Sequence, residues 1–127
     1  MKIWKYSGLM LIITGILHII LALLAGGEAF MEIYRNNGIF NSIARDNYYH
    51  QTAFWFLICG VLLIPFGQIL HYYQKREQKP APLSLGYSLL ILSILGCIIM
   101  PVSGFWLFLP QALIIIIANN RLFNKFK

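Results

Sequence analysis

Three long stretches of this chain contain no charged residue and are predominantly apolar: Tyr6 to Gly27, Gln51 to Tyr73, and Pro80 to Asn120. A helix needs about 20 apolar residues to cross the hydrocarbon of a bilayer. The first two stretches each match one such helix, and the third is long enough for two. None of the resulting segments carries the polar stripe that a helix of a water-soluble bundle needs. The pattern therefore predicts an integral membrane protein.

Composition and charge agree with this prediction. Hydrophobic residues make up 59% of the 127 residues and charged residues only 11%, whereas soluble domains carry about 25% charge. The net charge of +6 comes from basic residues at the ends of the apolar stretches. That placement favours anionic lipid headgroups as the partner, and we expect no nucleic-acid binding.

The third stretch is predicted to break at Pro101-Val102-Ser103-Gly104, because proline has no backbone N–H and glycine tolerates turn geometry. The outer segment has helical spacing at Phe30, Ile33 and Tyr34, so the first helix is predicted to continue to about Tyr34. A short amphipathic helix around residues 40–44 is then expected on the outer interface, with a flexible loop as the alternative. The predicted spans are about 6–27, 51–73, 83–100 and 105–120, with an outer cap at 28–49. Together they predict a single all-α domain, 1–127, that forms a four-transmembrane-helix bundle.

The orientation follows from lysine and arginine, which concentrate on the cytoplasmic side of membrane proteins. Of the 10 basic residues, all but Arg35 and Arg45 precede the first span, follow the fourth, or lie between the second and third. With four spans these three regions share one side. Both termini are therefore predicted to be cytoplasmic, in a multi-pass protein of the plasma membrane.

Small residues recur every seven positions in the first two spans. Helices in lipid associate through close packing, which small residues permit. The stripe is Gly8, Gly15 and Ala22 in the first span, and Ala53, Gly60 and Gly67 in the second. These stripes predict that the first two spans are close antiparallel partners.

His18 is the titratable residue that lies well inside a span, and ionisable groups at such depth are functional candidates. A neutral histidine that only hydrogen-bonds between helices is the alternative. Glu28, His50 and Gln111 are expected in the same outer half, where they would form a polar pocket beneath the cap. Residues at the outer end of a span are also polar simply because water is there. The spacing of His18, Glu28 and His50 matches no metal-binding motif, so we expect no metal and no cofactor.

Two short motifs carry a resemblance to a known family. Gly15-Ile16-Leu17-His18 in the first span, followed by Ala53-Phe54-Trp55-Phe56 and Gly60 in the second, resemble an uncharacterised family of small bacterial four-helix membrane proteins, a domain of unknown function. The resemblance covers nearly the whole chain and implies the four-span architecture. It draws attention to His18 and Trp55 but brings no activity with it.

Three functions stay open at this point, and no catalytic residue is assigned. The first is binding of a lipid, a small apolar ligand or a partner membrane protein through the outer pocket, with His18, Glu28, His50, Trp55 and Gln111 as the candidate residues. The second is a small proton-coupled transporter or exporter, for which a homodimer would supply the enclosed volume. The third is a lipid-modifying enzyme in which His18 acts with Glu28 or His50 as acid and base.

Overall fold

In a computed structural model the chain is all-helical, as predicted. The structure describes residues 3–37, 48–101 and 103–123, and these contain no strand. The elements in chain order are the 3-10 helix η1 (Ile3–Tyr6), α1 (Ser7–Asn37), α2 (Tyr48–Glu77), α3 (Leu83–Ile99), the 3-10 helix η2 (Gly104–Leu107) and α4 (Phe108–Phe123). The predicted break in the third apolar stretch is confirmed, because α3 ends before Pro101 and helix resumes at Gly104.

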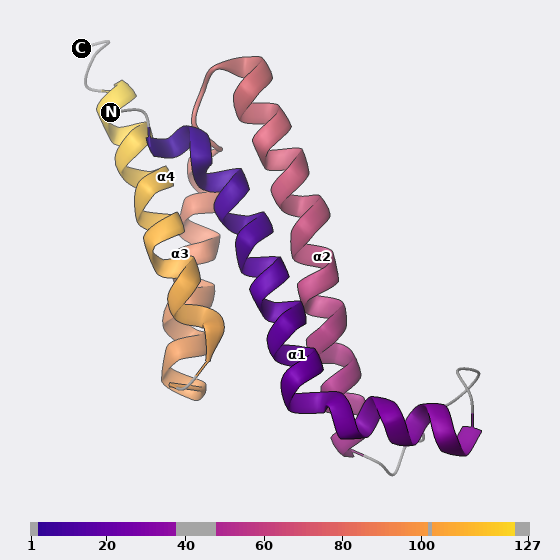
Figure 1. Cartoon of the computed structure of the whole chain (residues 1–127). Helices are drawn as coiled ribbons and strands as arrows, with labels where there is room; N and C mark the ends of the chain where they lie inside the picture. Colours follow the sequence, from indigo (N-terminus) through magenta and orange to yellow (C-terminus); the bar gives the residue numbers. More distant parts are fainter. Residues whose placement is uncertain (1–2, 38–47, 102, 124–127) are drawn as a thin grey trace.

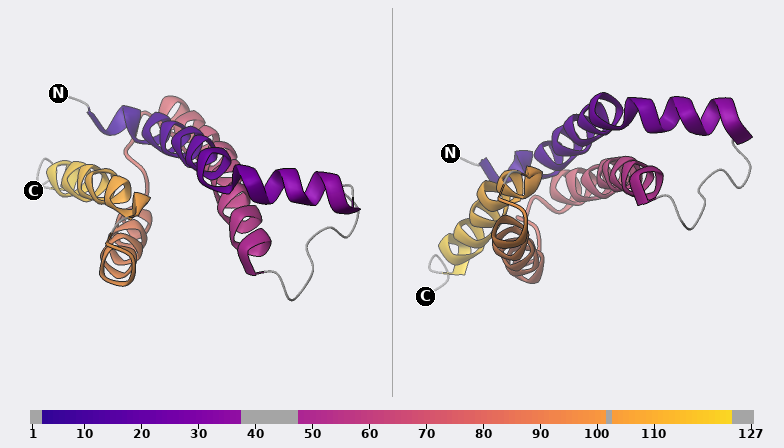
Figure 2. Two further views of the ribbon diagram at one scale, coloured as in Figure 1. Left: turned by 60° about the horizontal axis from the view of Figure 1, so that its bottom comes forward. Right: turned by 90° about the horizontal axis from the view of Figure 1, so that it is seen from below.

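The four α-helices form two antiparallel hairpins, α1 with α2 and α3 with α4 (Figure 1). Helix η1, the α2–α3 connection and the end of α4 lie at the same end of the molecule. In the described residues no Cα atom of α3 comes within 8 Å of α1 or α2, and the hairpins meet through α1, α4 and the two 3-10 helices. The views along the helices show this open arrangement (Figure 2). The prediction of a four-helix bundle is therefore not confirmed.

Helices α1 and α2 pack through the predicted small-residue stripes. A Cβ atom placed on Gly15 would lie 2.9 Å from the carbonyl oxygen of Gly60, and one placed on Gly67 would lie 2.8 Å from that of Gly8. Only glycine allows the two backbones to approach this closely, because a Cβ atom at either position would clash with the other helix. The prediction that the first two helical segments are close antiparallel partners is confirmed.

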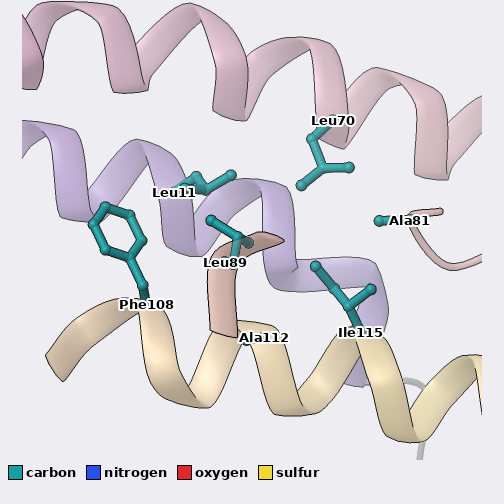
Figure 3. Packing of buried hydrophobic residues seen from close by; sticks show 7 residues of the cluster. All are labelled: Leu11, Leu70, Ala81, Leu89, Phe108, Ala112 and Ile115. Carbon is teal, nitrogen blue, oxygen red and sulfur yellow. The ribbon is translucent and has the colours of Figure 1, made fainter. Parts of the chain in front are cut away.

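A neighbouring face of α1 meets the second hairpin. Leu11 lies on this face and is 5% exposed. It belongs to a buried apolar cluster drawn from both hairpins and from the α2–α3 connection. The cluster consists of Leu11, Leu70, Ala81, Leu89, Phe108, Ala112 and Ile115 (Figure 3). Helix α1 thus uses one face for α2 and the next for α4.

Within the second hairpin, small residues of α3 receive large residues of the following segment. Gly86 packs against Ile115, and the ring of Phe105 covers Gly96 so closely that no Cβ atom would fit there. The hydroxyl of Ser93 donates a hydrogen bond of 2.9 Å to the carbonyl of Phe105. These contacts hold η2 and the start of α4 against the end of α3.

Helix α1 continues to Asn37, past the predicted end near Tyr34. Its carboxyl-terminal third runs at a steep angle to the rest of the helix (Figure 1). The sequence in this region contains the pair Gly26-Gly27, and glycine pairs are a common cause of helix kinks. The amphipathic helix predicted around residues 40–44 lies outside the described residues.

Three helical segments are long and apolar enough to cross a membrane: Ile3–Arg35, Tyr48–Glu77 and Gly104–Phe123. The remaining apolar helix, α3, is shorter. Many large apolar side chains are exposed on these helices, and Leu24, Ile98 and Ile99 are more than two-thirds exposed. A surface of this kind is costly in water because it leaves large apolar patches in contact with solvent.

Candidate functional site

His18 lies where α1, α2 and η2 meet. Its imidazole packs on the ring of Phe56 in α2, with the ring centroids 3.9 Å apart and the planes at 39°. A Cβ atom placed on Gly104 of η2 would lie 3.8 Å from Nδ1 of His18. The side chain is half-buried. His18 thus lies between the two hairpins, with the ring of Phe56 on one side and Gly104 on the other.

One helical turn before His18, Thr14 forms a hydrogen bond across the hairpins. The amide Nε2 of Gln111 in α4 donates to Oγ1 of Thr14 over 2.9 Å. Oγ1 of Thr14 in turn donates to the carbonyl of Met10 over 2.8 Å, so the orientation of this hydroxyl is set. Gln111 is only 1% exposed. Its Oε1 atom is buried and has no hydrogen-bond partner among the described residues.

These five residues form what we call the junction site: Thr14, His18, Phe56, Gly104 and Gln111. Helix α1 brings Thr14 and His18 to one face because residues four apart lie one above the other. Helix α4 runs antiparallel to α1, so Gln111 faces Thr14 and Gly104 faces His18. Chemically the site offers an imidazole and a carboxamide oxygen within apolar surroundings, and none of its five members is a lysine, arginine, aspartate or glutamate.

The other predicted site residues lie elsewhere. His50 is buried at the start of α2 and its Nε2 atom is 2.9 Å from Oε2 of Glu32. Glu28 is exposed, and Trp55 is 62% exposed. Of the predicted group, His18 and Gln111 therefore belong to the junction site. His50 pairs instead with Glu32, where the carboxyl-terminal part of α1 lies beside the start of α2.

Sequence reasoning missed Thr14, Phe56 and Gly104 as members of the junction site. Thr14 was recognisable on the same helical face as His18, but nothing local to α1 or α4 pairs it with Gln111. A second buried polar contact was also missed, at the opposite end of the first hairpin. There Nε2 of Gln74 donates to Oγ of Ser7 over 2.5 Å, and Gln74 is 1% exposed. Gln74 directly precedes Lys75 and Arg76, so its burial was not predictable from the neighbouring residues.

Metal-ligating side chains do not cluster in the described part of the chain. Within residues 3–37, 48–101 and 103–123, no three His, Cys, Asp or Glu side chains lie close enough to hold a metal ion. Cys59 and Cys97 are free thiols on different hairpins.

These features define the class of protein: an all-helical chain of two hairpins, with three helices long and apolar enough to cross a membrane. The chain belongs to a family of unknown function, DUF6463, whose model matches residues 2–122. The predicted resemblance to an uncharacterised family is thereby confirmed, and a bacterial source stays a prediction. No curated protein matches the chain, and no solved structure matches it.

Proposed function

We propose that this is a multi-pass integral membrane protein that binds an uncharged, hydroxyl-bearing lipid at the junction site. The membrane part of the proposal is supported by the apolar helices and by the exposure of their large side chains. Lipid is the solvent in which such a surface is stable. In this proposal α3 spans with the other helices, although its 17 residues rise only about 25 Å. The bilayer would thin or the helices would adjust locally around the second hairpin.

The ligand part of the proposal rests on the Oε1 atom of Gln111, which is buried and has no hydrogen-bond partner among the described residues. A buried carbonyl oxygen without a donor costs roughly 1–3 kcal/mol, so such an atom in a folded protein requires an explanation. A ligand hydroxyl would supply the donor. His18, one turn along α1 from Thr14, would offer the second polar contact.

The absence of cationic side chains from the junction site indicates which class of lipid it would bind. The junction site contains neither lysine nor arginine, the side chains that recognise phosphate through their positive charge. The amino end of η2 at Gly104 is capped by Ser103, whose Oγ accepts a hydrogen bond from the N–H of Phe105. An uncharged headgroup therefore fits better than an anionic phospholipid. Because Gln111 is almost fully buried, the ligand would enter when the contact between α1 and α4 loosens. That contact is less extensive than the one between α1 and α2.

The enzyme hypothesis relies on Glu28 or His50 as the acid–base partner of His18. Glu32 contacts His50, and Glu28 is exposed. The lipid-modifying hypothesis therefore has no carboxylate among the five residues of the junction site. For this reason we place binding before catalysis.

The test is the lipid that the protein retains when it is extracted from membranes directly into polymer nanodiscs. Mass spectrometry of the extracted lipid should show an uncharged hydroxyl-bearing species enriched over the bulk membrane. Enrichment should fall several-fold in His18→Leu and in Gln111→Leu, while Gln68→Leu, the same substitution on an exposed face of α2, should retain it. Helical circular dichroism and thermal stability would identify a variant that fails to fold. The proposed ligand would be contradicted if the wild type showed no enriched lipid. It would also be contradicted if both His18→Leu and Gln111→Leu retained the enrichment.

A further inference from the structure

Helix α2 presents an exposed face on the side away from the second hairpin. Four residues share this face because they follow one another at helical spacings of four, three and four: Val61, Pro65, Gln68 and Tyr72. All four are exposed. Leu63 and Leu70 of the same helix contact the buried apolar cluster and lie on another side of α2. We call the set of Val61, Pro65, Gln68 and Tyr72 the outward face.

Two polar groups on the outward face lack a hydrogen bond that they would ordinarily make. Pro65 lies inside α2 and has no N–H, so it cannot donate to the carbonyl of Val61. The carboxamide of Gln68 makes no hydrogen bond to any described residue. In a bilayer, which the proposed function requires, lipid tails offer these groups neither donors nor acceptors.

The Cα–Cβ bond of Gln68 points away from the inner headgroups. Every Cα–Cβ bond of an α-helix tilts toward the amino terminus of the helix, so the side chain of Gln68 leans toward Pro65. Tyr72 and Lys75, which mark the inner border of the span, lie in the opposite direction along α2. The carbonyl of Val61 points along the helix toward Pro65 as well. The carbonyl of Val61 and the Cα–Cβ bond of Gln68 therefore both face the same stretch of α2, between residues 61 and 68.

We propose that the outward face of α2 is the interface of a homodimer in the membrane, in which Gln68 of each copy hydrogen-bonds across a two-fold axis. The argument for a second copy is self-complementarity. A carboxamide both donates and accepts, and two copies in the same orientation bring identical groups to identical depth. A two-fold axis along the membrane normal then pairs the same face of both copies. The freed carbonyl of Val61 supplies one more acceptor at this level.

This inference rests on the membrane embedding of the proposed function but not on the lipid ligand. Gln68 lies on α2 away from the junction site. Substitutions at Gln68 and at the junction site should therefore affect dimerisation and lipid binding independently. Gln111→Leu should retain less lipid and dimerise as the wild type does, and Gln68→Leu should dimerise more weakly and keep the lipid. A protein that is absent from the membrane fraction would contradict both proposals, whereas a monomer in the membrane would contradict only this one.

The test measures the monomer–dimer equilibrium by energy transfer between labelled copies in liposomes at decreasing protein-to-lipid ratio. Interhelical hydrogen bonds in membranes contribute modestly, so Gln68→Leu should weaken dimerisation by about threefold to thirtyfold. The positional control is Gln68→Leu combined with Ile69→Gln. It keeps one glutamine at nearly the same depth but moves the carboxamide to the next side of the helix, where Ile69 is 66% exposed. The control should dimerise as weakly as Gln68→Leu alone.

Cross-linking maps the face directly. In a Cys59→Ser, Cys97→Ser background, Val61→Cys should form a disulfide between copies in membranes, while Leu62→Cys on the adjacent side should not. Unchanged dimerisation in Gln68→Leu overturns the proposal. So does cross-linking at residue 62 without cross-linking at residue 61, or cross-linking of residue 61 to a different membrane protein.

Discussion

Gly15 of α1 and Gly60 of α2 lie in direct backbone contact: a Cβ atom on Gly15 would sit 2.9 Å from the carbonyl oxygen of Gly60, and one on Gly60 would sit 3.1 Å from that of Gly15. The relationship is reciprocal because the helices are antiparallel. Gly8 and Gly67 repeat it two turns along the hairpin. The first hairpin is therefore held by close backbone packing between α1 and α2 at these glycines.

Gly67→Ala should destabilise the first hairpin. The added Cβ would lie 2.7 Å from Cγ1 of Ile12 and 2.8 Å from the backbone of α1, and the backbone cannot move away as a flexible side chain can. Overpacking of this kind costs about 1–3 kcal/mol. The free energy of unfolding, measured by steric trapping in bicelles, should fall by that amount.

Gly27→Ala is the matched control, because nothing lies within 4 Å of a Cβ atom at that position. Alanine is the better helix former by about 1 kcal/mol, so Gly27→Ala should leave stability unchanged or raise it slightly. Equal destabilisation by both substitutions would show that loss of glycine itself, rather than the close helix contact, is responsible.

Thr14→Val should weaken the connection between the two hairpins. Valine keeps the shape of threonine but removes the hydroxyl that accepts from Gln111, and so leaves the buried amide without a partner. The expected loss is about 1 kcal/mol in the free energy of unfolding. Thr52→Val is the control, because Thr52 is exposed and donates only within α2, to the carbonyl of Tyr48. A loss of equal size in the control would contradict the role of the Thr14–Gln111 contact.

The proposed orientation predicts which residues water-soluble reagents reach. In the Cys59→Ser, Cys97→Ser background, Arg35→Cys should react with a membrane-impermeant maleimide in intact cells. Glu77→Cys should react only after the membrane is opened, because Glu77 lies near the basic residues that we place in the cytoplasm. Both positions are exposed, so access through the membrane decides the result. The opposite pattern would reverse the proposed topology.

The helical class of the protein, the break near Pro101 and the contact of α1 with α2 were all predictable from the sequence. Each depends on a pattern that is local or periodic. Apolar length sets where helices run, proline and glycine set where they stop, and a seven-residue repeat of small residues marks the side of a helix that another helix can approach.

The site was predictable only in part. His18 and Gln111 were recognisable as polar residues in apolar segments, but the pairing of Gln111 with Thr14 spans 97 residues of sequence. Whether His50 would contact Glu28 or Glu32 was equally open from the sequence, since the two acids are one turn apart on α1. The tertiary structure selected Glu32.

The sequence by itself determined which segments are apolar helices and which side of α1 meets α2, because these follow from residue periodicity within single helices. Only the tertiary structure decided that the two hairpins stay open instead of closing into a bundle, and that the face of α1 with Thr14 and His18 meets α4. The reason is physical: the way two hairpins meet depends on how side chains fit between segments far apart in the chain, and an apolar surface alone does not specify that fit.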